Sequence, residues 1–83
     1  MREIGKKSKG VVAYVLMVTE IGKEHEIISQ LLKIKGVTEA RTVYGEFDVI
    51  VIVEADNMKN LDDYITRVRK MPQLIRTVTL ISA

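Results

Sequence analysis

The chain has 83 residues, a formal net charge of +2, one histidine and no cysteine. This length allows one domain, and the lack of cysteine excludes disulfides, thiolate metal sites and a cysteine nucleophile. No apolar run approaches the roughly 20 residues of a membrane span, and the N-terminus lacks a signal-peptide pattern. We therefore expect a cytoplasmic protein with no membrane partner.

The positive charge is concentrated at the N-terminus. Residues 1–10 contain four lysine or arginine residues and one glutamate, which gives this tail a charge of +3. Residues 11–83 then carry −1, so the body has no cationic surplus for following a phosphate backbone. We expect a basic tail over residues 1–10 and one folded domain over residues 11–83. The tail is either a solvated end or a docking segment for nucleic acid or an acidic partner.

The first part of the domain predicts a strand followed by a helix. Val11 to Val18 is apolar at every position, which indicates a strand with both faces shielded from water. Gly22 to Glu24 opens a helix that we expect to run to about Ile34. Its apolar stripe recurs every three or four residues, at Ile27, Ile28, Leu31, Leu32 and Ile34. Gly36 then suits a cap at the helix C-terminus.

A hairpin is predicted next, with one strand over Val37 to Tyr44 and the other over Phe47 to Val53. Glu39 and Arg41 lie within the first of these strands, and charges there are typical of a sheet edge. Gly45 permits a positive φ, so we expect a tight type II′ turn of about two residues around it.

The last part of the domain predicts a second helix and a final strand. Asp56 or Asn57 can cap the start of this helix, and Pro72 ends it. Its apolar stripe consists of Met58, Leu61, Ile65 and Val68. Leu74 to Ile81 is then the fourth strand.

This order of elements predicts an α+β fold of the ferredoxin-like βαββαβ type. Right-handed crossovers place the strands of an antiparallel sheet in the spatial order 4-1-3-2, with both helices on one face. The first and third strands are apolar throughout, whereas strands of a sheet with one wet face should alternate. The other face must therefore be covered, and no part of this chain is left to cover it. We expect a second copy to do so, in an obligate dimer formed through that face.

Three stretches carry a resemblance to one family. They are Ala13 to Met17 before a glycine-opened helix, Gly45 to Asp48 between two strands, and Leu74 to Thr79 at the end. Together they resemble the RAM domain (regulation of amino-acid metabolism), which is the effector-binding half of Lrp/AsnC, or feast/famine, transcription regulators. The similarity covers about Val11 to Ser82. Such regulators also carry an N-terminal helix-turn-helix, and ten residues cannot form one, so the chain resembles a stand-alone RAM module without direct specific DNA binding.

The resemblance implies a ligand, partners and site residues. It implies binding of an amino acid or related small molecule without a cofactor, dimers that assemble into octamer or decamer rings, and co-assembly with full-length Lrp/AsnC regulators. The positions that match the family's effector site are Tyr44, Gly45, Glu46, Asp48, Thr77 and Thr79. Carboxylates there can accept hydrogen bonds from a ligand ammonium, while the Gly45 amide and the threonine hydroxyls can donate to its carboxylate.

Other interpretations of these residues stay open. Asp48 can accept hydrogen bonds from the turn's own amides, Glu46 can be a solvated turn residue, and the threonines can reflect strand propensity alone. Arg76 is expected to pair with a neighbouring acid.

Catalysis has little support, because a single histidine, His25, without cysteine leaves nucleophile-and-base constellations incomplete, and no metal site is expected. A cofactor-independent monooxygenase of the dimeric α+β-barrel type and a purely structural co-assembly module remain the alternatives. Abundant isoleucine, valine, lysine and glutamate with few amides hint at a thermophile.

Overall fold

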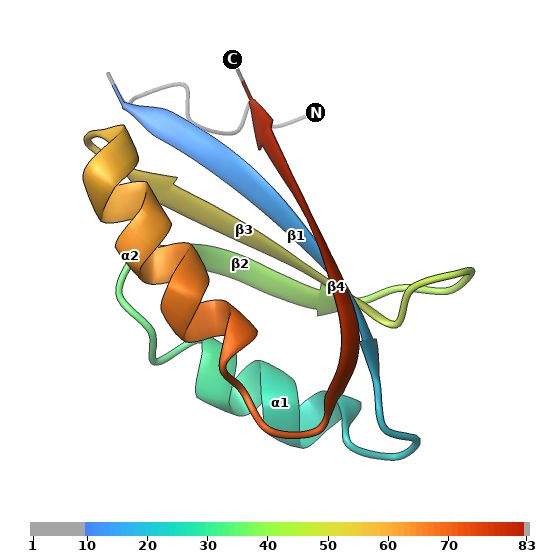
Figure 1. Cartoon of the computed structure of the whole chain (residues 1–83). Coiled ribbons are helices and arrows are strands. Elements are labelled where there is room, and N and C mark those ends of the chain that lie inside the picture. Colours follow the sequence, from blue (N-terminus) through green and yellow to red (C-terminus); the bar gives the residue numbers. More distant parts are fainter. Residues whose placement is uncertain (1–9, 83) are drawn as a thin grey trace.

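The computed structural model describes residues 10–82, so the basic tail lies outside the described residues. The elements are β1 (Val11–Thr19), α1 (Glu24–Leu31), β2 (Val37–Thr42), β3 (Val49–Ala55), α2 (Met58–Arg69) and β4 (Leu74–Ser82). The strands form one antiparallel sheet in the order β2-β3-β1-β4, and both helices lie on one face of it (Figure 1). Read from the other edge, this is the predicted order 4-1-3-2. The ferredoxin-like βαββαβ fold is therefore confirmed.

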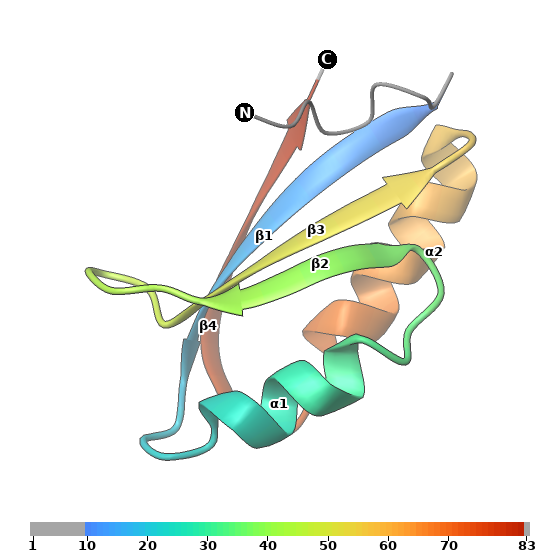
Figure 2. The same cartoon turned by 180° about the vertical axis from the view of Figure 1, so that it is seen from behind.

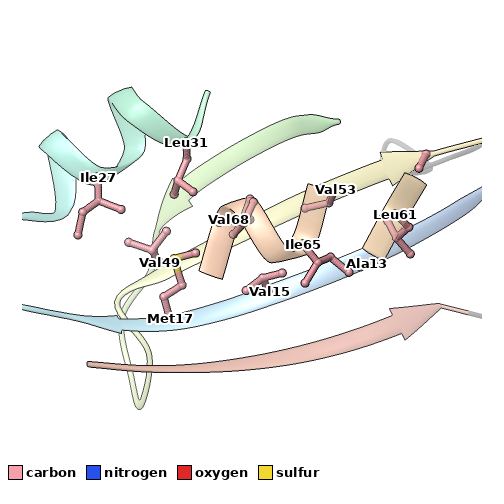
Figure 3. Packing of buried hydrophobic residues seen from close by; sticks show 12 residues of the cluster. Ala13, Val15, Met17, Ile27, Leu31, Val49, Val53, Leu61, Ile65 and Val68 are labelled. Carbon is pink, nitrogen blue, oxygen red and sulfur yellow. The ribbon is translucent and has the colours of Figure 1, made fainter. Parts of the chain in front are cut away.

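The hydrophobic core lies between the helices and the central strands β1 and β3. Alternate residues of these strands face the helices, with Met17 opposite Val49 and Ala13 opposite Val53 in the ladder. Side chains from both helices complete the cluster (Figure 3): Ile27, Leu31, Leu61, Ile65 and Val68. The apolar stripes predicted for the two helices thus supply the buried side chains, although Leu32 and Met58 are exposed.

Helix α1 is shorter than the sequence predicts. It ends at Leu31 rather than near Ile34. The chain tightens there, because the amide of Lys33 donates to the carbonyl of Gln30 and the amide of Ile34 donates to that of Leu31. These are three-residue spacings, which commonly finish a helix. The predicted cap at Gly36 is wrong, because the C-cap residue of α1 is Leu32. Gly36, with a φ of +93°, lies in the turn directly before β2.

Helix α2 begins at a side-chain cap. The amide of Asn60 donates to Oδ1 of Asn57 at 2.8 Å, so Asn57 is the N-cap rather than Asp56. This contact satisfies one of the amides that the first helical turn leaves without a partner. One of the two caps predicted from the sequence is therefore confirmed.

The hairpin turn predicted from the sequence is wrong in length and type. Strand β2 ends at Thr42 and β3 begins at Val49. The amide of Val43 donates to the carbonyl of Asp48 at 2.9 Å, which leaves the four residues from Tyr44 to Phe47 in the loop. Gly45 has a φ of +128°, far from the value of about +60° that the first central residue of a type II′ turn adopts. The glycine is needed for its freedom of backbone conformation, but in a wider loop.

The face of the sheet away from the helices is aliphatic. Leu16 lies between Ile50 and Val78 in the ladder, and Tyr14 lies between Ile52 and Leu80. These six residues alternate with those of the core cluster, so they point away from the helices, and we call this surface the open face. Ile52 is nevertheless only 6 % exposed. Figure 2 shows both helices on the opposite side of the sheet. Strands β1 and β3 therefore present apolar side chains on both faces, as predicted.

Candidate functional site

The loop between β2 and β3 meets the end of β1 and the start of β4 at one end of the sheet. Antiparallel pairing brings these segments together, since β3 and β4 both begin where β1 ends. The loop extends beyond the edge of the sheet (Figure 1). We call this region the loop end and define it by Tyr44 to Asp48, Thr19 and Arg76.

Asp48 is fixed to the end of β1 by two hydrogen bonds. Its amide donates to the carbonyl of Met17 at 2.8 Å, and its Oδ2 accepts from the amide of Thr19 at 2.9 Å. The carboxylate thus takes the place of the backbone carbonyl that a regular ladder would present to Thr19. Such a bond to a charged acceptor contributes about 1.5–3 kcal/mol when it is shielded from water. Asp48 therefore has a structural role, but its partner is the neighbouring strand rather than an amide of the turn.

The tip of the loop stands free of the rest of this subunit. Tyr44, Gly45 and Glu46 are all exposed, and the side chain of Tyr44 is as accessible as in an extended chain. A Cβ built on Gly45 would meet no atom within 4 Å. Ile21 in the loop after β1 is 98 % exposed.

Thr77 and Thr79 lie on the helix side of the edge strand β4. They stand opposite Met17 and Val15 in the ladder, whose side chains face the helices. The helices pack mainly on β1, β2 and β3, so both threonines are only half-buried. Thr77 lies in the same row as Val49, the residue after Asp48. Thr79 is two residues further from the loop end, about 7 Å along the strand.

The predicted site residues therefore form two groups. Asp48 and Thr77 approach the last residues of β1 from its two sides, and the loop tip extends from the same end. Thr79 does not join them within one subunit. The structure does not test which of these residues contact a ligand.

Two residues at the loop end, Arg76 and Thr19, have surroundings that the sequence did not indicate. The guanidinium carbon of Arg76 lies 5.1 Å from the centre of the Phe47 ring, so the expected pairing of Arg76 with an acid is replaced by a contact with an aromatic face. Thr19 is only 3 % exposed. Among residues 10–82, its hydroxyl has no hydrogen-bond partner, and neither has the buried Oε1 of Gln73. The aromatic residue between two acids, Glu46-Phe47-Asp48, is the sequence signal that could have indicated the arginine contact.

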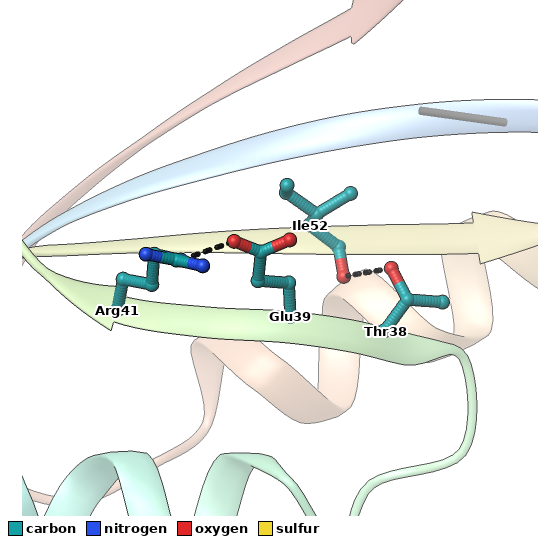
Figure 4. Close-up of polar contacts among 4 residues, drawn as sticks. All are labelled: Thr38, Glu39, Arg41 and Ile52. Carbon is teal, nitrogen blue, oxygen red and sulfur yellow. Dashed lines mark hydrogen bonds and ion pairs between the residues drawn. The ribbon is translucent and has the colours of Figure 1, made fainter. Parts of the chain in front are cut away.

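Edge strand β2 carries polar side chains that pair with one another and with the backbone of β3. Arg41 Nε donates to Glu39, and Thr38 Oγ1 donates to the carbonyl of Ile52 at 3.3 Å (Figure 4). Arg41 is largely exposed, so this ion pair contributes little stability. Its place is informative, because Glu39 and Arg41 lie opposite Ile52 and Ile50 and form a charged rim beside the open face.

The described residues contain neither a candidate metal site nor a candidate membrane-spanning helix. Within residues 10–82, no group of three or more histidine, cysteine, aspartate or glutamate side chains is arranged to hold a metal ion. Over the same residues, no helix is long and apolar enough to span a membrane.

The chain thus combines a ferredoxin-like fold, an open face that is aliphatic apart from Tyr14, and a polar loop end. The model of the Lrp/AsnC ligand-binding domain matches residues 12–83, and the chain belongs to this family. The resemblance inferred from the sequence is thereby confirmed.

Solved structures and curated proteins agree with this assignment. Hypothetical protein PHS023 from Pyrococcus horikoshii has 50 % sequence identity and a TM-score of 0.81 over 88 % of this chain and 89 % of its own. The HTH-type transcriptional regulator FL11 of Pyrococcus horikoshii is 25 % identical over 71 residues, which are 86 % of this chain and 47 % of FL11. The chain thus spans about half the length of the curated relatives it matches. Escherichia coli AsnC shares the fold, with a TM-score of 0.76 at 15 % identity over 99 % of this chain and 56 % of its own.

Proposed function

We propose that this chain is a stand-alone module that binds an amino acid, or a related small-molecule effector, and assembles into oligomers. Its role is in the transcriptional regulation of amino-acid metabolism, without contacting DNA specifically through these residues. The observation that carries the proposal is the loop end, where a carboxylate is fixed on β1 beside an exposed loop. Membership of a ligand-binding domain family and the 89 % coverage of a solved relative's chain support it.

A zwitterionic ligand fits the chemistry of the loop end. Asp48 uses Oδ2 for the Thr19 amide, so a ligand ammonium can be bound by the same carboxylate group without breaking that bond. Glu46 is exposed in the adjacent loop and can supply a second acceptor. The amide of Gly45 and the hydroxyl of Thr77 can donate to the ligand, while Tyr44 can cover its side chain. We include Thr79 through a neighbouring subunit, because it lies away from the loop within one subunit.

Assembly is the second half of the proposal. The open face joins aliphatic side chains from three strands, and the Glu39–Arg41 pair and Arg76 lie along its two edges. An apolar centre with a polar rim is the usual composition of a subunit interface. A second copy, related by a two-fold axis, would bury this face against itself. Further association of dimers into octamer or decamer rings, or with full-length Lrp/AsnC regulators, would then use the exposed loop ends.

The module is proposed to be regulatory rather than catalytic. His25, the one histidine, is exposed on α1. Neither a nucleophile with an adjacent base nor a pair of carboxylates in contact occurs among the described residues of the loop end.

The experiment is a thermal-shift screen of the protein with each of the twenty L-amino acids. A bound amino acid at 100 times its dissociation constant should stabilise the fold by about 2.7 kcal/mol. For a domain of this size, that raises the unfolding midpoint by about 10–20 °C. The proposal fails if none of the twenty changes the midpoint.

Two variants at Asp48 separate its structural role from ligand binding. Asp48→Asn keeps an oxygen that accepts from the Thr19 amide but removes the negative charge. We expect its midpoint without ligand to stay close to that of the wild type and the amino-acid shift to disappear. Asp48→Ala should lose the shift and also about 1–3 kcal/mol of stability, because the Thr19 amide loses its acceptor. Asp63→Asn, at an exposed acid on α2, is the control, and an unchanged shift for Asp48→Asn would make Asp48 purely structural.

A further inference from the structure

Arg76 is a cation held at the loop end by an aromatic ring rather than by an acid. Its guanidinium carbon lies 5.1 Å from the centre of the Phe47 ring, within the range of a cation–π contact. Among the described residues, no carboxylate forms an ion pair with it, although Asp48 is the neighbour of Phe47 in the chain. A guanidinium over a ring forms no ion pair there, so its N–H groups remain available for a planar acceptor.

The position of Arg76 brings opposite charges to the two sides of β1. Arg76 pairs with Val18 from the β4 side. Asp48 bonds to Met17 and Thr19 from the β3 side. The guanidinium carbon of Arg76, on β4, lies 5.1 Å from the centre of the ring of Phe47, which precedes Asp48. A group that can accept from an ammonium and a group that can donate to a carboxylate therefore flank the last residues of β1.

We propose that Arg76 binds the carboxylate of the effector through a bidentate pair of hydrogen bonds, and that Phe47 positions its guanidinium. This inference rests on the proposed function and narrows it, since it requires a ligand with a free carboxylate. Amines, amides and esters of the same skeleton would lack the planar, doubly accepting group that the guanidinium fork matches. Arg76 is thus the residue that distinguishes an amino acid from derivatives that lack its carboxylate.

The test uses matched pairs of probes, namely each of the twenty L-amino acids and its α-carboxamide, with affinities measured by calorimetry. We expect an amino acid that binds the wild type to bind about 10–100 times more tightly than its amide, the range of a charge-assisted hydrogen bond. Arg76→Gln should weaken binding of the amino acid by a similar factor and leave the affinity for the amide unchanged. Arg76→Lys keeps the charge but not the fork, so it should give an intermediate affinity for the acid.

Two further variants distinguish carboxylate binding from a structural role. Phe47→Leu should lower the ratio of acid to amide affinity by less than Arg76→Gln does, because the arginine stays charged but loses its platform. Arg41→Gln is the matched control, since Arg41 is also an exposed arginine beside the open face but lies on β2. It should leave the ratio unchanged. If Arg76→Gln does not fold, Arg76→Lys takes its place in the test. A ratio of acid to amide affinity equal to that of the wild type in Arg76→Lys would then overturn the inference.

The outcomes separate this inference from the proposed function. If an amino acid binds and Arg76→Gln retains the wild-type ratio, the role of Arg76 is overturned and the proposed function stands. If the wild type binds an amino acid and its amide with equal affinity, the role of Arg76 is likewise overturned and the proposed function stands. If neither acids nor amides bind, the proposed function fails and the inference fails with it.

Discussion

The two faces of the sheet are built from the same kinds of side chain but lie in different surroundings. On the helix side, residues such as Val15, Met17 and Val51 are fully buried under α1 and α2. On the open face, Leu16 and Ile50 alternate with them in the ladder and are only half-buried. Aliphatic residues on a wet face gain nothing from burial. One face is therefore completed within the chain, and our proposal is that a second copy covers the other.

The largest expected effect is on the helix side. Leu31 is fully buried in the cluster between α1 and the sheet. Leu31→Ala should lower the free energy of unfolding by about 2–5 kcal/mol, because it removes apolar contacts and leaves a cavity. Chemical denaturation followed by circular dichroism measures this change. Leu32→Ala is the control, since its neighbour Leu32 is 54 % exposed and should change the free energy by less than about 0.5 kcal/mol. Equal losses for the two variants would contradict the assignment of the core.

The same truncation on the open face tests whether that face is covered. Leu16→Ala should lower the stability by about 1–3 kcal/mol if a second copy buries Leu16. The loss should also be concentration-dependent, because dimer formation links stability to protein concentration. Analytical ultracentrifugation should show a dimer for the wild type and a larger monomer fraction for the variant. A wild-type protein that sediments as a folded monomer at micromolar concentration would refute the dimer.

The same comparison shows how far the sequence predicts the molecule. The strand order follows from composition, because uninterrupted apolar runs in β1 and β3 require the central places and the charges of β2 suit an edge. The cap at Asn57 follows from a local rule as well. These features depend on residues that are close in the chain.

The loop end was less predictable because its contacts join distant residues. The bond from the Thr19 amide to Asp48 spans 29 positions, and no local pattern announces it. The register of β1 and β4 also shifts between Val18 and Thr19, so Thr19 pairs with Leu74 and Ile75 is left without a partner on β1 beside Arg76. A two-residue turn was expected from Gly45 alone, whereas the bonds of Asp48 to β1 set the loop length. The ligand contacts of this region remain a prediction.

The smallest expected effect is a loss of stability at the start of α2, on the helix side of the sheet, without a change in assembly. Helix α2 covers only the helix side of the sheet, and its first turn depends on the bond from the Asn60 amide to Asn57. Asn57→Ala should lower the free energy of unfolding by about 1 kcal/mol, which is a fall of about 4–8 °C in the midpoint. The adjacent Asp56→Ala should have little effect, since the side chain of Asn57, and not that of Asp56, is the cap. Because neither residue lies on the open face, sedimentation should give the same subunit number for both variants as for the wild type. A change in subunit number with Asn57→Ala would show that α2 takes part in assembly, and that the helix side is not complete within one chain.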